Sequence, residues 1–334
     1  MLSATAIQRI QESGRLVLHA VGDTRGVNTP TPQELVTRYM EQDFATTGDL
    51  SRNPSFFYHI GDVVYYAGET ANYYPEFYEP YNLYPAPIFA IPGNHDGDVD
   101  PLAPEASLAA FVRNFCAKVP THTPDAKDSP RQAMTQPNVY WTLEAELATI
   151  IGLYSNCPEG GELEPTQIAW FQEELAAAPQ NRALVVAVHH PIYSAYGPHP
   201  GSQPLNAIFE QACRASQRTP DLVLTGHVHN YQRFTAPLAG RAINFIVAGA
   251  GGYNQQLHML AREFNAAKVP IQMPGSAGTL ESFCDTNHGY LWIQVTPACI
   301  HCEYRAIPNV DPNLPAAKLP AAKVYDTVDI PIGA

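Results

Sequence analysis

Five short blocks of the sequence each place polar side chains directly after a run of apolar, mostly β-branched residues. The apolar runs cover residues 16–21, 56–60, 88–91, 184–188 and 222–225. The blocks are Gly22-Asp23, Gly61-Asp62-Val63-Val64-Tyr65, Gly93-Asn94-His95-Asp96, Val188-His189-His190-Pro191 and Gly226-His227-Val228-His229. Continuous apolar runs are typical of buried strands, so each polar side chain is expected in a loop at a strand's carboxyl end. The pattern predicts an α/β chain with a metal site at one end of a sheet.

The side chains of these blocks suit two adjacent metal ions better than one. They offer three carboxylates, one amide, one phenol and several imidazoles. A single structural zinc ion would want four closed cysteine or histidine ligands, and the oxygen content here is too high for that. Any one block alone could be an ordinary turn, because Gly, Asp and Asn are common in turns. It is the ordered set of five that indicates a metal centre.

This ordered set resembles the calcineurin-like metallophosphoesterases and, within them, the purple acid phosphatases. The resemblance spans about residues 16–250 and uses all five blocks. It implies an α/β fold of two mixed β-sheets packed face to face, with helices on the outer faces. In one departure, Asp23-Thr24-Arg25 stands where most members have Asp-x-His, which removes a histidine ligand from the first metal.

A tyrosine in the second block compensates for the missing histidine. Tyr65 stands three residues after Asp62, as in the tyrosine-bearing purple acid phosphatases. If the chain is helical after Asp62, positions i and i+3 share a face and both side chains can reach one ion. Tyr66 at i+4 satisfies the same geometry, and only the family pattern selects Tyr65.

The resemblance implies a ligand set for each metal. For the first metal it is Asp23, Tyr65, His229 and a bridging Asp62, and for the second it is Asp62, Asn94, His189 and His227. His189 is preferred over His190 because the family's ligand stands two residues before a proline, here Pro191. Carboxylates and a phenolate favour a hard, highly charged ion, whereas imidazoles and an amide suit a divalent one. The expected metals are Fe(III) at the tyrosine-bearing site and Fe(II), Zn or Mn at the second.

Hydrolysis of a phosphate ester is the reaction that such a centre implies. Two cations roughly 3.5–4 Å apart lower the pKa of the water between them and orient the resulting hydroxide behind phosphorus. His95 is the family's residue for assisting the leaving group, and Asp96 is expected to orient it. His199, in the loop after the fourth block, is a second candidate for catalysis and substrate binding. Arg25 could contact a phosphate oxygen through its planar fork.

Each of these last assignments has a simpler alternative. Arg25 could form a structural salt bridge, His199 could be an exposed loop histidine, and Asp96 could be a solvated turn residue.

Three functions are compatible with the blocks. The leading one is a phosphomonoesterase of the purple acid phosphatase type. The second is a phosphodiesterase acting on cyclic nucleotides or nucleotide-like diesters, built from the same ligands. The third is a module that binds metal without turnover, against which the intact His95 and the complete ligand set count.

Composition bounds the domain organisation and the substrate. A chain of 334 residues with 45% hydrophobic content can bury a substantial core. No linker separates the blocks, so we expect a single domain over residues 1–334, with a core at about 16–306 and a tail at 307–334. The formal charge of −13 argues against a nucleic acid polymer and leaves a small phosphorylated substrate as the expected partner. The oligomeric state stays open.

The expected location is the cytoplasm. The amino terminus lacks the basic, apolar and small-residue order of a signal peptide, and no apolar stretch approaches the length of a membrane span. The six cysteines are scattered. Cys299 and Cys302 form a lone C-x-x-C within a predicted strand, where residues three apart face opposite sides, so free thiols are expected.

Several further elements follow from periodicity. Helices are expected at residues 3–12, 166–178 and 205–215, a hairpin at 142–145 and 149–153, a strand at 243–248, and final hairpin strands at 290–295 and 299–306. Eight aromatic residues lie between Tyr65 and Tyr84. They are expected to pack a helix onto the sheet, or alternatively to place Tyr73, Tyr84 or their neighbours in the cleft, stacked on an aromatic or nucleoside leaving group. Residues 253–288 are expected to be an insertion or lid.

Overall fold

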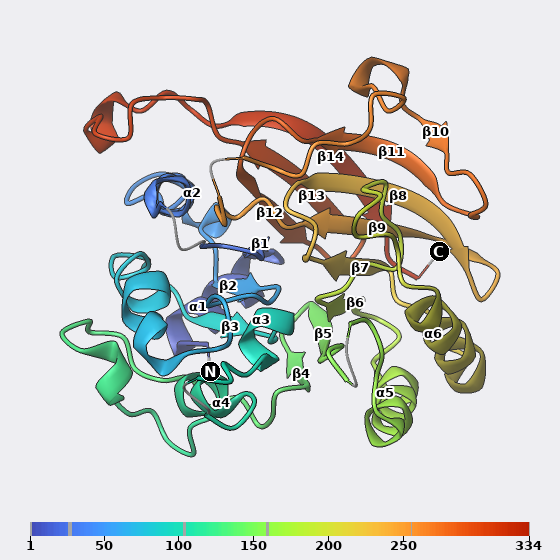
Figure 1. The fold of residues 1–334 in the computed structure, drawn as a ribbon, viewed down its shortest axis with the longest axis horizontal. Helices are drawn as coiled ribbons and strands as arrows, with labels where there is room; N and C mark the ends of the chain where they lie inside the picture. The colour runs from blue at the N-terminus through green and yellow to red at the C-terminus, as the bar shows by residue number, and fades with distance from the viewer. Residues whose placement is uncertain (1, 26–28, 103–104, 158–159, 255, 334) are drawn as a thin grey trace.

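Two mixed β-sheets packed face to face form the centre of the structure (Figure 1). The computed structural model describes residues 2–25, 29–102, 105–157, 160–254 and 256–333. Within these residues, one sheet has six strands in the order β14-β13-β12-β1-β2-β3. The other has eight strands in the order β10-β11-β8-β9-β7-β6-β5-β4. The predicted two-sheet architecture is confirmed.

The bounds of the strands and helices are as follows. The six-stranded sheet contains β1 (Leu16–Val21), β2 (Phe56–His59), β3 (Ile88–Ala90), β12 (Gly289–Val295), β13 (Cys299–Ala306) and β14 (Lys323–Pro331). The eight-stranded sheet contains β4 (Trp141–Glu144), β5 (Ala148–Leu153), β6 (Ala183–Val188), β7 (Leu222–Thr225), β8 (Tyr231–Leu238), β9 (Arg241–Ala248), β10 (Ile271–Gln272) and β11 (Thr279–Cys284). The α-helices are α1 (Ala4–Ser13), α2 (Thr31–Gln42), α3 (Asn94–Gly97), α4 (Ala109–Phe115), α5 (Pro165–Ala177) and α6 (Gln203–Ser216). Short turns of other helix types are η1 (Leu50–Arg52), η2 (Thr70–Asn72), η3 (Tyr74–Tyr78), η4 (Pro124–Ala126), η5 (Ala266–Lys268) and η6 (Ala316–Lys318).

Parallel strands in each sheet bring the block loops to one end. In the six-stranded sheet β1, β2 and β3 run parallel, and in the eight-stranded sheet β5, β6, β7 and β9 run parallel. The remaining ladders are antiparallel. All five block loops therefore leave the carboxyl ends of parallel strands, which is where α/β sheets bind ligands.

The parallel strands are buried on both faces, which explains their continuous apolar runs. Along β1, Leu18 and Ala20 enter the core between the sheets, whereas Val17 and Val21 enter a second core on the outer face. Successive residues of a strand point to opposite faces, so a strand with a core on either side has apolar residues at nearly every position.

Helices cover the outer face of each sheet. Phe171 of α5 and Phe209 of α6 pack on the outer face of the eight-stranded sheet, and the two helices lie side by side in Figure 1. Val36 and Met40 of α2 pack on the outer face of the six-stranded sheet. The helices predicted at residues 3–12, 166–178 and 205–215 are α1, α5 and α6, each within two residues of the expected ends.

The aromatic segment packs onto the six-stranded sheet but is not a regular α-helix. It forms the 3₁₀ turn η2 and the π-helical turn η3, and its rings belong to the outer core. Tyr73 and Tyr84 are buried there, so the alternative that they line the cleft is wrong for these two residues. The packing prediction is confirmed, whereas the helix type differs because the aromatic pattern reports the buried face and not the hydrogen-bond register.

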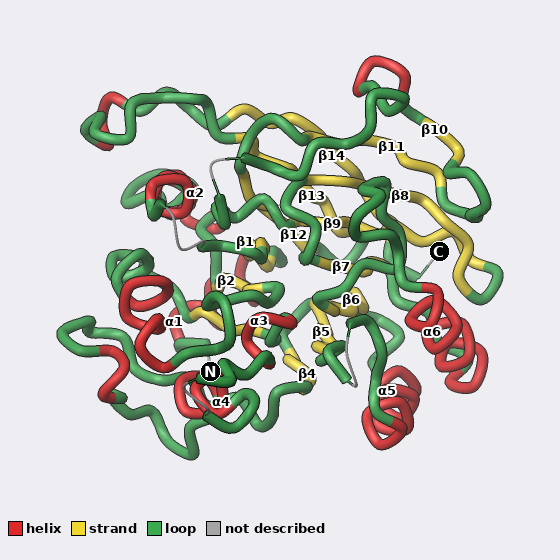
Figure 2. The backbone as a smooth tube through the Cα atoms, viewed as in Figure 1, coloured by secondary structure: helices red, strands yellow, loops and turns green. Residues whose placement is uncertain are grey.

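Four strands were not expected. β8 pairs with β9, and β11 pairs with β8, so part of residues 253–288 extends the eight-stranded sheet. β14 pairs with β13 within the segment that we expected to be a tail. These strands lie toward the sheet edges, where one face stays polar and the apolar signal is weaker (Figure 2, yellow). All six cysteines are free thiols, as expected.

Candidate metal centre

Two buried carboxylates and an imidazole meet at the carboxyl ends of three strands. Asp23 follows β1, Asp62 follows β2, and His189 follows β6 of the other sheet. Each offers a ligand atom, and these atoms lie within 4.8 Å of one another. The Nε2 atom of His189 is 3.4 Å from Oδ2 of Asp62. Both sheets therefore contribute to one cluster.

Tyr65 and His229 join this cluster on the side of Asp23. The Tyr65 hydroxyl lies 3.5 Å from Oδ1 of Asp23, and Nε2 of His229 lies 3.4 Å from the same oxygen. Tyr65 is fully buried, whereas the Tyr66 side chain is 46% exposed. The geometry thus distinguishes two tyrosines that spacing alone could not.

Asn94 and His227 lie on the other side of the cluster. Oδ1 of Asn94 is 3.0 Å from Nδ1 of His227, and the His227 ring centroid is 5.3 Å from that of His189. The backbone amide of His95 donates to Oδ1 of Asp62 at 3.0 Å. The seven side chains expected as ligands therefore gather in one place, and their role as ligands stays a prediction.

Three of these seven residues have left-handed backbone conformations. The φ angles are 56° at Asp23, 53° at Asp62 and 67° at His227. Such conformations cost about 1–3 kcal/mol each outside glycine, and they persist at functional sites where the surrounding structure enforces them. Three of the seven described non-glycine residues with positive φ are therefore candidate ligands.

The glycines of the blocks make room for ligands from other blocks. Gly61 has φ +91°, and a Cβ atom there would lie 2.5 Å from Nδ1 of His189. A Cβ atom on Gly93 would overlap the Asp62 carboxylate. Glycine is therefore required at both positions by close approach, in addition to the turn geometry at Gly61.

The charges of the three central groups are strongly coupled. Burial, together with the nearby Asp62, raises the pKa of Asp23 to about 8 against the opposing effect of His189. Burial also opposes ionisation of Asp62, but the charge of His189 and its contact outweigh it and lower the pKa of Asp62. Burial lowers the pKa of His189, yet the Asp62 carboxylate outweighs burial and raises it to about 9. The charges of His189 and Asp62 therefore balance each other, whereas the raised pKa of Asp23 keeps that carboxyl group protonated near neutral pH.

The arrangement fits a bound cation. Nε2 of His189 is buried and has no hydrogen-bond partner among the described residues, while its Nδ1 donates to the carbonyl of Ile60 at 2.9 Å. Burial lowers the pKa values of His227 and of His229, the latter to about 3, so both rings are neutral, which is the form that binds metal. Carboxylate, phenol, amide and neutral imidazole donors facing one another are the ligands of a metal centre.

Carboxylates hold the loop that carries Tyr65. The loop is irregular, so the helical turn expected after Asp62 is not formed. Instead, consecutive backbone amides donate to three side chains: Val63 and Val64 to Asp96, Tyr65 to Glu76, and Tyr66 and Ala67 to Glu69. Side-chain acceptors thus replace the helix's own carbonyls and fix the direction in which Tyr65 points.

Asp96 does not orient His95 as we expected. Its buried carboxylate accepts hydrogen bonds from the amides of Gly93, Val63 and Val64, and burial raises its pKa to about 7. Nδ1 of His95 instead donates to the carbonyl of Tyr66 at 2.7 Å. Because that carbonyl can only accept, Nε2 is the ring nitrogen of His95 that is left for a substrate.

His199 lies at the mouth of the centre, and Arg25 acts on Glu76. The His199 ring centroid is 4.7 Å from that of His227, and both side chains line a cavity of about 600 Å³ beside Asn94. The charge of Arg25 acts on Glu76, whose pKa burial raises to about 7 against the effects of the Tyr65 amide and Arg25. The predicted phosphate contact of Arg25 stays a prediction.

The sequence blocks missed three side chains of the centre. Tyr253 has its ring centroid 4.2 Å from that of His229 and 4.5 Å from that of Tyr65. His258 stacks on His229 with centroids 4.1 Å apart, and Tyr196 stacks on His258 at 4.4 Å. Tyr253 and His258 belong to the segment expected as an insertion, and neither directly follows an apolar run, so only the presence of aromatic residues there gave a signal.

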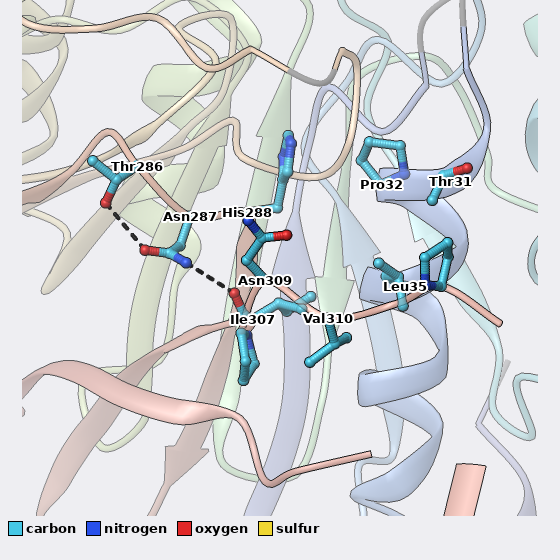
Figure 3. A pocket seen from close by; sticks show the side chains of 11 residues that line it. Thr31, Pro32, Leu35, Thr286, Asn287, His288, Ile307, Asn309 and Val310 are labelled. Atoms are coloured by element: carbon cyan, nitrogen blue, oxygen red, sulfur yellow. Dashed lines mark hydrogen bonds between the residues drawn. The ribbon is translucent and has the colours of Figure 1, made fainter. Parts of the chain in front are cut away.

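A second cavity lies away from these residues. It has a volume of about 440 Å³ and opens between the start of α2, residues 286–288 and residues 307–312 (Figure 3). Asn287 bridges its wall by donating to the carbonyl of Ile307 at 3.0 Å. None of its lining residues is a carboxylate or a candidate ligand. It is therefore not part of the metal centre.

Comparison with known families decides the classification. The sequence model of the calcineurin-like phosphoesterases matches residues 15–231, which include all five blocks. The chain belongs to the calcineurin-like phosphoesterase family. Members of this family typically bind two metal ions, in agreement with the cluster around Asp23 and Asp62. A search of curated proteins by sequence finds no match.

Solved structures share the fold of this calcineurin-like phosphoesterase at low identity. GAP50, titled the anchor in the inner membrane complex of Plasmodium, has a TM-score of 0.63 at 15% identity, covering 95% of this chain and 89% of its own. The purple acid phosphatase PPD1 from yellow lupin seeds has a TM-score of 0.61 at 16% identity, covering 95% of this chain and 54% of its own. PhoD has a TM-score of 0.61 at 13% identity, covering 95% of this chain and 70% of its own.

These likenesses establish the fold alone. A protein described as an anchor and one described as a phosphatase share it, so the activity must be argued from the site. In the part of the chain that the structure describes, no helix is long and apolar enough to cross a membrane.

Proposed function

We propose that this calcineurin-like phosphoesterase is a dinuclear-metal-dependent phosphomonoesterase of the purple acid phosphatase type. The observation that carries the proposal is the position of Tyr65, whose buried hydroxyl lies 3.5 Å from Oδ1 of Asp23. A phenol is an unusual metal ligand, and its place beside a carboxylate and the His229 imidazole suits a ferric ion. The second ion would be Fe(II), Zn or Mn.

Two groups of side chains would hold the ions. Asp23, Tyr65, Asp62 and His229 would hold the first, and Asp62, Asn94, His189 and His227 would hold the second. Asp62 is suited to bridging because its ligand atom lies within 4.8 Å of those of Asp23, from the first set, and His189, from the second. The bound ions would supply a nucleophile from water and neutralise charge on the phosphoryl oxygens.

The chain's own residues would bind and protonate the ester. His95 has Nδ1 fixed by the Tyr66 carbonyl, so its Nε2 would carry a proton to the leaving oxygen. His199, on the wall of the 600 Å³ cavity, would contact the phosphoryl group or the leaving group. That cavity suits a small phosphorylated substrate, and the formal charge of −13 disfavours a nucleic acid polymer.

One domain over residues 1–334 would carry the whole site. The candidate ligands come from loops of both sheets, and the two sheets share one core. Separating the sheets would therefore divide the ligand set.

The experiment compares two ester types on the reconstituted protein. The demetallated protein is loaded with iron, zinc or manganese, and hydrolysis of an aryl phosphate is compared with that of the bis-aryl diester. The proposal predicts that the monoester is preferred in kcat/KM. Preference for the diester would contradict it in favour of a phosphodiesterase. Two bound metals without hydrolysis of either ester would indicate a module that binds metal without turnover.

A further inference from the structure

Three rings form a stack beside the candidate metal centre. The His258 ring lies between those of His229 and Tyr196. Its centroid is 4.1 Å from that of His229, with planes 19° apart, and 4.4 Å from that of Tyr196, with planes 11° apart. Near-parallel planes at these distances place the rings in direct contact. Both faces of His258 are therefore engaged.

Hydrogen bonds fix His258 to the loop that carries His229. The His258 amide donates to the carbonyl of His229 at 3.0 Å, and the His229 amide donates to Nδ1 of His258 at 3.1 Å. The side-chain amide of Asn230 donates to the carbonyl of His258 at 2.7 Å. The ring of His258 is thus held in register with that of His229.

Among the described residues, no partner makes the hydrogen bond that normally orients a metal-binding histidine to the His229 ring. Such a ring usually donates its second nitrogen to a carboxylate, a carbonyl or a water molecule. His189 follows this rule, because its Nδ1 donates to the carbonyl of Ile60. Nδ1 of His229 is buried and has no hydrogen-bond partner among the described residues. The His229 ring is therefore held in its orientation by packing against neighbouring side chains.

We propose that His258 is a positioning residue of the metal centre, and that its stacked ring fixes the rotation of His229 in place of a hydrogen bond. This inference rests on the proposed function, because it requires His229 to be a metal ligand. It makes the segment around His258 part of the metal centre and not a passive insertion. His258 itself need not touch a metal ion or the substrate.

Stacking and hydrogen bonding can be separated by the choice of substitution. His258→Ala removes the ring and the Nδ1 acceptor, His258→Phe keeps a ring that can stack, and His258→Asn keeps an acceptor without a stacking ring. His122→Ala is the matched control, because His122 lies in another loop, where its Nε2 contacts the carbonyl of Ser129. Melting curves of all variants in excess chelator establish that each one is folded.

The measurement is zinc binding to the demetallated full-length protein, followed by chelator competition at one fixed pH. The inference predicts that His258→Ala weakens one of the two zinc sites about 10–100-fold, the usual effect of losing a group that orients a ligand. The other zinc site should stay within about 3-fold of the unmodified protein. His258→Phe should restore most of the affinity, whereas His258→Asn should resemble His258→Ala.

Three results would overturn the inference. Unchanged binding in His258→Ala would show that the stack does not position His229. Equal weakening of both sites would point to general structural damage. Rescue by Asn but not by Phe would assign the effect to the hydrogen bond. An unmodified protein that binds no zinc would instead contradict the proposed function, and the inference with it, so the two failures are distinguishable.

Discussion

The carboxylate of Glu76 accepts a hydrogen bond from the backbone amide of Tyr65 at 2.8 Å. Glu76 belongs to the aromatic segment on the outer face of the six-stranded sheet, and Tyr65 points into the metal centre. The packing of that segment and the direction of the candidate phenol ligand are therefore linked through one buried side chain.

Replacing Glu76 should destabilise the loop in a way that depends on the acceptor. Glu76→Leu leaves the Tyr65 amide buried without a partner, which costs about 1–3 kcal/mol. Glu76→Gln keeps an oxygen acceptor and should lose less. Urea unfolding of the demetallated variants measures the difference. Equal stability of the Leu and Gln variants would contradict this role for Glu76.

Removing the imidazole of His95 should slow turnover while sparing metal binding. His95→Ala leaves the Asp62 carboxylate and its amide contact in place, because that contact comes from the His95 backbone. We expect kcat to fall at least ~100-fold, the effect of losing a general acid. Steady-state kinetics with metal analysis of the same sample test this. A near-unchanged kcat at full metal loading would remove His95 from the mechanism.

An added methyl group at Gly93 should disrupt the centre. Its Cβ would overlap the carboxylate of Asp62, which would have to move. Gly93→Ala should therefore bind metal at least ~10-fold more weakly, as when ligand-supporting groups are lost. Gly240→Ala is the control for glycine replacement, because a Cβ atom at Gly240 meets open space, and because the backbone there, with φ +89° against −94° at Gly93, is the more strained of the two by a side chain. Equal metal affinity in the two variants would disprove this packing argument.

A buried network away from the metal centre should make stability depend on acid pH. Asp43 contacts His19 of β1, Tyr290 of β12 and Arg305 of β13. Burial opposes ionisation of Asp43, but the His19 hydrogen bond, together with the charges of His19 and Arg305, outweighs it and lowers the pKa of Asp43.

A carboxyl group with a lowered folded pKa stabilises the fold above its unfolded pKa of about 3.9, and this contribution is lost as the pH falls through the folded pKa. Asp43→Asn should lower the free energy of unfolding by about 2 kcal/mol at neutral pH, because hydrogen bonds to a charged group are lost. The difference in free energy of unfolding between Asp43→Asn and the unmodified protein should disappear below about pH 4. Unfolding curves across this range test it, and a difference that is constant with pH would refute it.

The sequence was sufficient to predict the central strands and to identify the block residues that gather at the candidate metal centre. β1 and β6 are buried on both faces, so their apolar runs are unambiguous, and Asp23 and His189 follow directly from where those runs end. Edge strands such as β14 expose one face, and spacing could not find them.

The directions in which individual side chains point could be determined only from the structure. Spacing allowed Tyr65 and Tyr66 equally, and the two are distinguished by where three carboxylates hold the loop backbone. Asp96 contacts backbone amides and not its neighbour His95 for the same reason. His258 reaches the centre through contacts distant in sequence, which no local pattern reports.

The most direct test of the account is the visible spectrum and metal content of aerobically purified protein, compared with Tyr65→Phe and Tyr66→Phe. A phenolate bound to ferric iron gives a purple charge-transfer band. If Tyr65 binds a ferric ion, the unmodified protein contains iron. Its purple band should then disappear in Tyr65→Phe and survive in Tyr66→Phe. A colourless protein with two divalent ions, or a band that persists in Tyr65→Phe, would contradict it.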